Sequence, residues 1–287
     1  MINDSERELK FKDLVKFKSI EEASEFLLEK EIESLLRNSH SEQFKWMEKK
    51  FNIPLTKNLT IWSDFIEITE RRNLFVHNNG IVSRQYIKVC EDNGVKISEI
   101  KVGDTLKVKP KYLANAYLVF YEIGFKLLQV LWRKLFPNEL ENADTSLINT
   151  TYDLLAHKRY KLAQTLLDFS CDILKKYHSD VNRRIMIINR ALAYKLDKNI
   201  EKCDSILKKD DWSATRLDFQ LAVAVLKNND KEVYRLMKEV GSKSKDLPEH
   251  TYLEWPLFEE YREKEDFLNM YKEIFGKELE LISKVKQ

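Results

Sequence analysis

The chain has few residues that interrupt regular secondary structure: its 287 residues include 6 glycines and 5 prolines. So little turn-forming chemistry predicts a mostly helical protein, and the fold class we expect is all-α. The three cysteines, Cys90, Cys171 and Cys203, lie far apart and form no CxxC pair. This spacing indicates neither a zinc site nor a disulfide framework. The sequence also shows no His, Asp and Glu cluster and no Gly-rich phosphate loop, so we expect no metal and no cofactor.

Long hydrophobic runs are missing as well. No stretch of about 18 apolar residues occurs, so the sequence predicts no membrane span. The N-terminal segment 1–13 is polar and mixed in charge, and it lacks the apolar centre of a signal peptide. Because the cysteine usage also fits a reducing compartment, we expect a cytoplasmic protein with no membrane partner.

The net charge of +2 is too close to zero to indicate nucleic-acid binding by itself. The charge is unevenly distributed, however. Residues 71–111 carry nine Lys or Arg side chains and four acids, a local net charge of +5, which leaves −3 for the rest of the chain. A locally positive segment would suit a phosphate backbone, and a solvated basic face would give the same pattern.

Apolar residues recur at helical spacing through the first half of the chain. Ser19-Ile20-Glu21-Glu22 has the pattern of a capping box and predicts the start of a helix that ends near Arg37. Ser41 is expected to cap a second, shorter helix. Thr60 is expected to cap a third helix, which ends at Gly80 in a left-handed conformation.

The segment after Gly80 is predicted to contain a short helix, an extended stretch and then a long helix. A short helix is expected from about residue 83 to residue 91. Residues 95–109 then alternate between apolar and polar, which indicates a small β-hairpin or an extended insertion. A long apolar stripe from Tyr112 to Leu135 predicts another helix, which Pro137 ends.

The polar connection 138–145 predicts a domain boundary, with one domain at 1–140 and another at 141–287. Apolar residues of the second domain fall into four units, each of which we interpret as a helical hairpin with a small or medium residue packed between its helices. These packed residues are Ala163, Cys203, Val233 and Met270. Their spacings of 40, 30 and 37 residues resemble a degenerate tetratricopeptide repeat, whose period is about 34. An irregular all-helical domain is the alternative.

The stretch Arg71-Arg72-Asn73-Leu74-Phe75-Val76-His77-Asn78-Asn79-Gly80-Ile81 places a cation, an amide and an imidazole together at the end of an apolar helix. Four residues separate Arg72 from His77, and Asn73 directly follows the arginine. With Val102-Gly103-Asp104 and the long helix that ends Leu131-Trp132-Arg133-Lys134-Leu135-Phe136-Pro137, this stretch resembles the metal-independent ribonucleases of the HEPN superfamily. The resemblance covers residues 15–137 and identifies the first domain as an HEPN-like helical bundle.

The resemblance implies an RNA endonuclease in which the 2′-hydroxyl attacks the adjacent phosphate and leaves a cyclic phosphate and a free 5′-hydroxyl. His77 would move the proton, since an imidazole titrates near neutral pH. Arg72 would hold the phosphate and stabilise the charge that builds on its oxygens. Asn73 would orient the histidine or the phosphate through hydrogen bonds.

Three other residues are candidates for RNA contact: Arg71, Asn78 and Arg84. Each has a plainer interpretation, Asn78 as a helix terminator and the two arginines as solvated cations. The sequence assigns no role to the other four histidines, because none has a partner at metal-ligand spacing; they are His40, His157, His178 and His250. Many HEPN toxins carry a tyrosine two residues after the histidine, where this chain has Asn79, so regulation by modification of that tyrosine is not expected.

On an ideal helix Arg72 and His77 would point about 140° apart. Either the helix ends before His77, or two copies of the motif meet in a dimer. HEPN domains pair in the second way, so the resemblance implies a homodimer through the first domain with a composite cleft.

Three functions follow from these patterns. The first is an RNA endonuclease in antiphage defence or a toxin–antitoxin system, with RNA as substrate and with a protein regulator or partner on the helical repeats. The second is a non-catalytic adaptor that dimerises and binds a protein partner. The third is a regulator built on helical repeats, which the sequence favours least because it shows no helix-turn-helix with a basic recognition helix.

Overall fold

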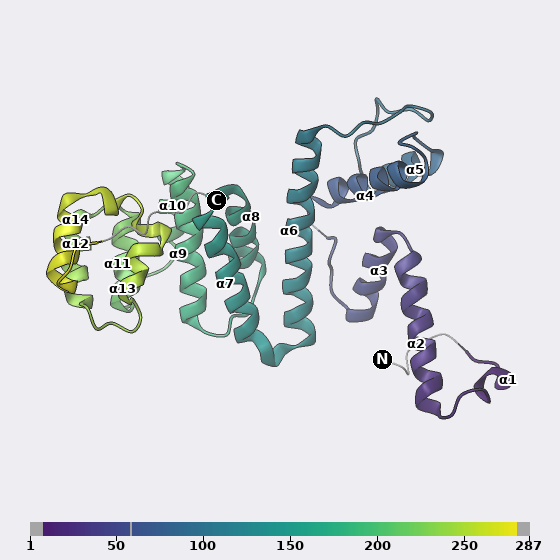
Figure 1. Cartoon of the computed structure of the whole chain (residues 1–287), viewed down its shortest axis with the longest axis horizontal. Helices are drawn as coiled ribbons and strands as arrows, with labels where there is room; N and C mark the ends of the chain where they lie inside the picture. Colours follow the sequence, from purple (N-terminus) through teal and green to yellow (C-terminus); the bar gives the residue numbers. More distant parts are fainter. Residues whose placement is uncertain (1–7, 58, 280–287) are drawn as a thin grey trace. The chain divides into compact units, whose positions relative to one another are not determined.

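The computed structural model describes residues 8–57 and 59–279; residues 1–7 of the polar N-terminal segment lie outside this range. Fourteen α-helices and no β-strand occur among the described residues (Figure 1). The prediction of an all-α fold is therefore confirmed. The chain forms two compact units, residues 1–123 and 124–287, and their division falls inside helix α6 (Pro110–Leu135).

Five helices and the first part of α6 form unit 1. They are α1 (Phe11–Leu14), α2 (Ile20–Arg37), α3 (His40–Phe51), α4 (Trp62–His77) and α5 (Arg84–Asp92). Proline at the first position of α6 has no N–H group to leave unpaired, which suits a helix start. Pro137 follows the end of α6, as predicted.

The caps of α2 and α3 decide where these two helices begin. Ser19 Oγ accepts the N–H of Glu22 at 3.2 Å, as predicted. The prediction that Ser41 caps α3 is wrong. Ser39 is the cap, and its reciprocal bonds with Glu42 complete a capping box. Because α3 begins two residues earlier than a Ser41 cap would allow, His40 belongs to its first turn.

A small apolar core holds α4, α5 and the following insertion together. Its buried members are Leu74, Val82, Tyr86, Cys90 and Ile97. The insertion is an extended loop, and a single isolated β-bridge between Ile81 and Thr105 replaces the expected hairpin. The Leu106 N–H donates to the carbonyl of Gly80 at 2.9 Å, so the loop returns to the end of α4.

Glu67 on α4 is the polar centre of unit 1. Its Oε1 accepts from Arg71 Nε at 2.6 Å and from the Tyr86 hydroxyl at 2.8 Å, while Oε2 accepts from the Tyr112 hydroxyl at 2.8 Å. The Arg71 guanidinium also lies over the Tyr112 ring, 4.4 Å from its centroid. One carboxylate therefore ties α4 to α5 and to the start of α6.

Unit 2 contains the rest of α6 and eight further α-helices. They are α7 (Leu140–Ala156), α8 (Tyr160–Asp168), α9 (Asp180–Leu196), α10 (Ile200–Leu207), α11 (Leu217–Leu226), α12 (Asp230–Val240), α13 (Glu249–Glu254) and α14 (Glu265–Phe275). The expected polar connection 138–145 is itself helical, because it forms most of the 3-10 helix η2 (Pro137–Glu139) and the first turns of α7.

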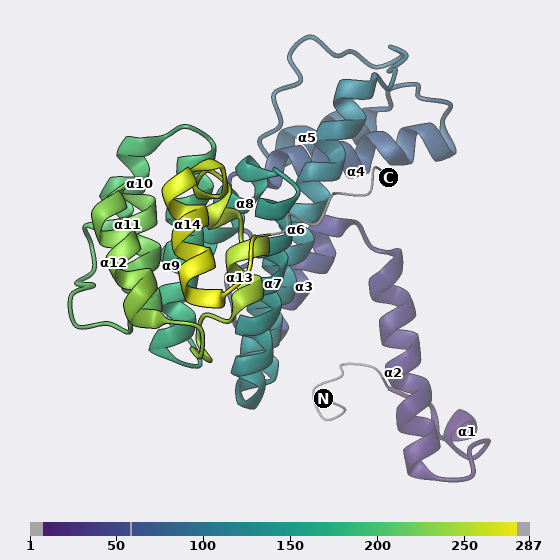
Figure 2. The same cartoon turned by 60° about the vertical axis from the view of Figure 1, so that its left-hand side comes forward.

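The helices α7 to α12 form three consecutive pairs, α7 with α8, α9 with α10 and α11 with α12 (Figure 2). The turns of the three pairs have the same backbone conformation. The middle residue of the turn is left-handed in each case, with φ of 58° at Lys158, 66° at Lys198 and 53° at Asn228. The next N–H donates back to the carbonyl five residues earlier, at 2.7, 2.9 and 3.0 Å in turn. The predicted small residues Ala163, Cys203 and Val233 are each the fourth residue of the second helix and are fully buried.

The fourth predicted unit is different. Between α13 and α14 the chain forms two 3-10 helices, η4 (Pro256–Phe258) and η5 (Tyr261–Glu263), in place of a short turn. Met270 is only half-buried there, whereas Phe267 is fully buried. Three hairpins with a common turn therefore occur, and the resemblance to tetratricopeptide repeats stays a prediction.

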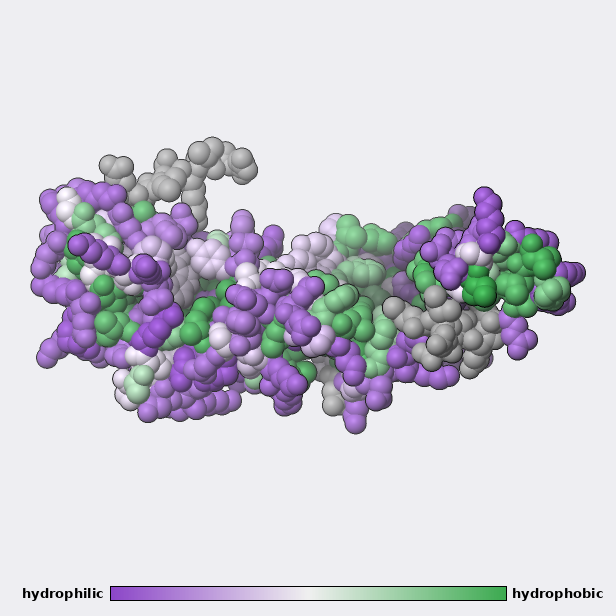
Figure 3. Space-filling model, turned by 90° about the horizontal axis from the view of Figure 1, so that it is seen from below, coloured by the Kyte–Doolittle hydropathy of each residue, from purple (hydrophilic) through white to green (hydrophobic). Residues whose placement is uncertain are grey.

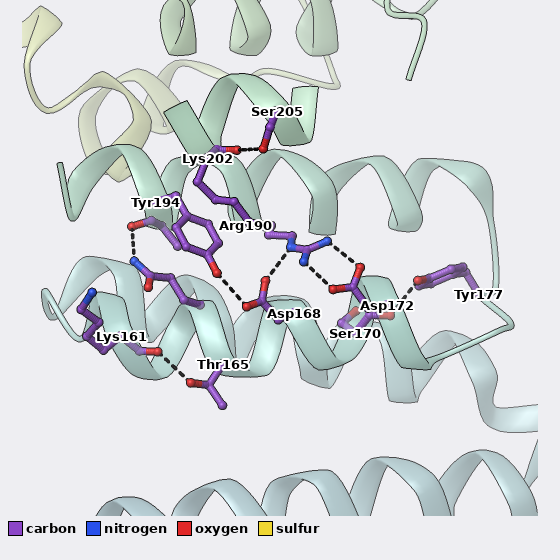
Figure 4. A network of polar contacts seen from close by, with 12 residues as sticks. Lys161, Thr165, Asp168, Ser170, Asp172, Tyr177, Arg190, Tyr194, Lys202 and Ser205 are labelled. Carbon is purple, nitrogen blue, oxygen red and sulfur yellow. Dashed lines mark hydrogen bonds and ion pairs between the residues drawn. The ribbon is translucent and has the colours of Figure 1, made fainter. Parts of the chain in front are cut away.

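An ion-pair network joins the second helix of the first pair to the first helix of the second pair (Figure 4). Arg190 on α9 donates to Asp168 at 2.7 Å and to both oxygens of Asp172 at 2.9 and 2.6 Å. Asp172 lies on the π-helix η3 (Phe169–Ile173) that continues α8. The Tyr194 hydroxyl donates to the second oxygen of Asp168 at 2.7 Å. These polar groups satisfy one another, so we assign the network a structural role.

Hydrophilic residues cover most of the face seen in Figure 3, with hydrophobic residues gathered in patches between them. In the part of α6 that belongs to unit 1, the exposed large apolar side chains are Leu113, Tyr117, Leu118 and Phe120. None of the helices in the described part of the chain combines the length and apolar character needed to cross a bilayer.

Candidate functional site

The residues of the Arg–Asn–His motif line an open cleft of about 870 Å³ in unit 1. The end of α2, the first turn of α3, the last turns of α4 and the start of α5 form its walls. Its lining is rich in amide, hydroxyl, imidazole and guanidinium groups, with one carboxylate; the polar residues are Arg37, Asn38, Ser39, His40, Gln43, Glu70, Arg72, Asn73, His77, Asn78, Ser83 and Gln85.

One face of α4 supplies the floor of this cleft. Asn73, Leu74 and His77 lie three, four and seven residues after Glu70, so the four residues lie on the same side of the helix. Arg72 is not on this stripe. Its Nη1 donates to Asn73 Oδ1 at 3.3 Å, which brings the guanidinium across its neighbour to the cleft.

The helix itself runs through His77, which is the last residue of α4. The alternative that the helix ends before His77 is therefore wrong. Arg72 and His77 nevertheless reach one cleft, because the arginine side chain is long enough to bend toward the stripe. The His77 ring is exposed, and among the described residues it has no hydrogen-bond partner.

Glu70 is the buried acid of the cleft. It is 9% exposed, and burial raises its pKa, while the charge of His40 and a hydrogen bond from Asn73 act in the opposite direction. Asn73 Nδ2 lies 3.5 Å from Glu70 Oε1. The Asn73 amide therefore links the carboxylate on one side to the Arg72 guanidinium on the other.

His40 is a cleft residue that the sequence did not predict. Its Nδ1 lies 3.0 Å from Gln43 Oε1, and its ring packs against Phe65 with centroids 5.5 Å apart. These contacts orient the ring, and the influence of His40 on Glu70 shows that it lies within electrostatic reach of the carboxylate. The Ser39-x-x-Glu42 capping box was the one available signal, since it places the next residue in a helical first turn.

Two helix N-termini also border the cleft. Ser39 caps α3 and Ser83 caps α5, and each hydroxyl accepts a backbone N–H three residues later. The first N–H groups of a helix have no intrahelical acceptor, and the helix dipole makes this end positive. With Arg37 and Arg72, these ends give the cleft an electrostatic character that suits a phosphate.

The structure places the three further RNA-contact candidates differently. Arg71 lies away from the cleft, since its guanidinium is paired with Glu67 and packed on Tyr112. Arg84 is exposed at the start of α5 but is not part of the lining. Asn78 lines the cleft, and its Nδ2 donates to the carbonyl of Ile81 at 2.6 Å, which also makes it a helix terminator.

Within residues 8–57 and 59–279, no group of three or more His, Cys, Asp or Glu residues could hold a metal ion. The cleft can position an anion with cations and helix ends, and it presents two imidazoles beside that anion. No protein-family model, curated protein or solved structure matches the chain.

Proposed function

We propose that the protein is a metal-independent RNA endonuclease, the activity that the resemblance to HEPN ribonucleases implies. The observation that supports this most is that Arg72, Asn73 and His77 all line one solvent-accessible cleft of a size that admits a nucleotide. A cytoplasmic role in antiphage defence or a toxin–antitoxin system is part of the same proposal.

The proposed reaction needs one base and one acid. His77 would take the proton from the 2′-hydroxyl as its oxygen forms a bond to phosphorus. The bond from phosphorus to the 5′-oxygen would break, and His40 as an imidazolium would give that oxygen a proton. Arg72, held by Asn73, would stabilise the negative charge on the non-bridging oxygens.

A homodimer through unit 1 is also proposed. The side chains of Leu113, Tyr117 and Phe120 are 63%, 63% and 45% exposed and follow one another on α6 at helical spacing. Such an apolar stripe on a surface helix supports a protein contact. Light scattering of the full chain should give twice the mass of a monomer. The Tyr117→Glu variant should give the mass of a single chain.

The test of the nuclease is a cleavage assay on total RNA in the presence of EDTA. We expect the wild-type chain to produce fragments with cyclic phosphate ends, and His77→Ala and Arg72→Ala to lose at least about 100-fold in rate. His157→Ala is the matched control, because His157 is an exposed histidine at the end of α7. Cleavage that EDTA abolishes would refute the metal-free mechanism.

A non-catalytic adaptor is the second candidate. The observation that favours it is the His77 ring, which has no hydrogen-bond partner to fix its orientation in the described part of the chain. A catalytic base is usually held by such a partner. The adaptor is supported if wild type and His77→Ala bind RNA or a partner equally and neither cleaves RNA.

A further inference from the structure

A second pocket lies in unit 2, on the side formed by the first helices of the three pairs. It has a volume of about 400 Å³, within the usual range for small-ligand sites. The helices α7, α9, α11 and α13 and the segment before α13 all contribute to its walls. No residue of this pocket belongs to the cleft in unit 1.

Asn189 is the buried polar group of this pocket. Its side chain lines the pocket and is 2% exposed. Within the described residues, its Oδ1 is shielded from solvent and accepts no hydrogen bond. A buried acceptor without a partner costs roughly 1–3 kcal/mol, so a ligand that donates a hydrogen bond to the Asn189 amide would remove that cost.

Aromatic rings and carboxylates line the same pocket as this amide. Tyr152 and Trp255 both line the pocket with half-buried side chains. Glu254 also lines it and has no hydrogen bond or ion pair among the described residues. Burial, followed by the charge of Glu254, raises the pKa of Tyr152, which shows that this carboxylate lies near the Tyr152 hydroxyl.

The single arginine of the lining does not offset this negative charge. Arg216 donates to both oxygens of Asp218, at 3.0 and 2.6 Å, and lies 3.2 Å from Asp246. One arginine against Asp218, Asp246 and Glu254 leaves a formal charge of −2 with His250 neutral. Arg262 is not part of the lining, although its charge reaches the Tyr152 hydroxyl and lowers the pKa of that group in opposition to Glu254. Its guanidinium donates to the carbonyls of Tyr252 and Trp255.

We propose that this pocket binds an organic cation, a primary ammonium or guanidinium group, between Tyr152, Trp255 and Glu254. Aromatic faces attract such cations, and a charge-assisted hydrogen bond to a carboxylate is stronger than a neutral one. The cation's remaining N–H groups would donate to the Asn189 amide. The same chemistry belongs to a free polyamine and to a lysine or arginine side chain of a partner protein.

Isothermal titration calorimetry on the full chain tests this with two probes. They are spermidine and the blocked peptide acetyl-Gly-Gly-Lys-Gly-Gly-amide, with glutamine in place of lysine as the peptide control. We expect saturable binding of at least one cationic probe and none of the glutamine peptide. Tighter binding of spermidine would indicate a free polyamine, and tighter binding of the lysine peptide would indicate a side chain.

Glu254→Gln should weaken that binding by about tenfold, the effect of losing a contact of about 1.4 kcal/mol. Glu254 is exposed, so this variant should fold as the wild type does. Glu201→Gln, on the exposed surface of α10, is the matched control and should bind unchanged. Asn189→Leu, checked by its melting curve, should also bind more weakly. Absence of saturable binding, or equal weakening in the Glu254 and Glu201 variants, would overturn the proposal.

Discussion

The Arg72 guanidinium donates a hydrogen bond to Oδ1 of Asn73 at 3.3 Å, although the two residues are neighbours on α4. Their side chains leave an ideal helix about 100° apart, so this bond requires the arginine to bend toward the face of Asn73. The same face carries His77. Asn73 therefore determines where the cation of the cleft points.

Removing the Asn73 amide should release Arg72 from the cleft. For the proposed nuclease activity, we expect Asn73→Ala to lower kcat by about 100-fold, the scale of a misplaced catalytic group, with little change in melting temperature. Asn115→Ala, at an exposed asparagine of α6, is the control. Unchanged kcat in Asn73→Ala would show that Arg72 needs no such support.

The stability of unit 1 should depend on the protonation of Glu70. Burial raises its pKa above the ordinary value of 4.5. A raised pKa in the folded state means that the charged form of Glu70 destabilises the fold. The contribution of Glu70 to stability is therefore most favourable below about pH 4.5 and is lost as the pH rises. Glu70→Gln should therefore be more stable than wild type at pH 7, by roughly 1 kcal/mol, and equally stable near pH 4. Urea unfolding at both pH values measures this, and a gain that is independent of pH would contradict it.

Glu67 should matter far more to stability, because it pairs with Arg71 and two tyrosine hydroxyls. We expect Glu67→Ala to lower the free energy of unfolding by about 3–5 kcal/mol, since it leaves a largely buried arginine without its partner. Tyr112→Phe removes one hydrogen bond and should cost about 1 kcal/mol. Urea denaturation measures both. Equal costs for the two variants would show that the Glu67–Arg71 ion pair adds nothing.

Local signals in the sequence predicted the helices around the cleft, but not all of their ends. Gly80 follows the end of α4 with φ of 77°, as expected. Ser39 rather than Ser41 caps α3, and Ile61 rather than Thr60 is the N-cap residue of α4. The contribution of His40 could not be predicted in this way. It lies 32 residues before Arg72 in the sequence, and its approach to Glu70 depends on how the start of α3 packs against α4.

The conformation of the turns in unit 2 could not be predicted from the sequence either. The periodic apolar residues predicted three of its helix pairs, but not the conformation of their turns. Lysine has no preference for a left-handed backbone, yet Lys158 and Lys198 both adopt one. The backbone hydrogen bonds that close each hairpin impose this conformation on residues that do not favour it.

Two glycines with similar backbone angles should respond differently to alanine. Gly80 and Gly94 have φ of 77° and 72°, but a Cβ at Gly80 would lie 2.9 Å from Phe75 and 3.1 Å from the carbonyl of Leu106, whereas Gly94 faces open space. Both variants should lose roughly 1–2 kcal/mol from the left-handed conformation. Gly80→Ala should lose more, because the returning loop must also shift. Thermal melting compares them, and equal losses would mean that the loop does not pack on Gly80 in solution.

Replacing Lys198 by glycine should stabilise unit 2. The lysine holds φ of 66° at the turn between α9 and α10, a conformation that glycine adopts without strain. Its ion pair with Glu260, at 3.6 Å, is exposed and contributes little. The relief of strain exceeds the added freedom of the unfolded chain, so we expect a gain of about 0.5–1 kcal/mol in urea unfolding. Lys202→Gly, inside α10, should instead cost about 1 kcal/mol. Destabilisation by both variants would show that Lys198 is not left-handed in solution. The hairpin of α9 and α10 would then not share the turn conformation of the other two hairpins.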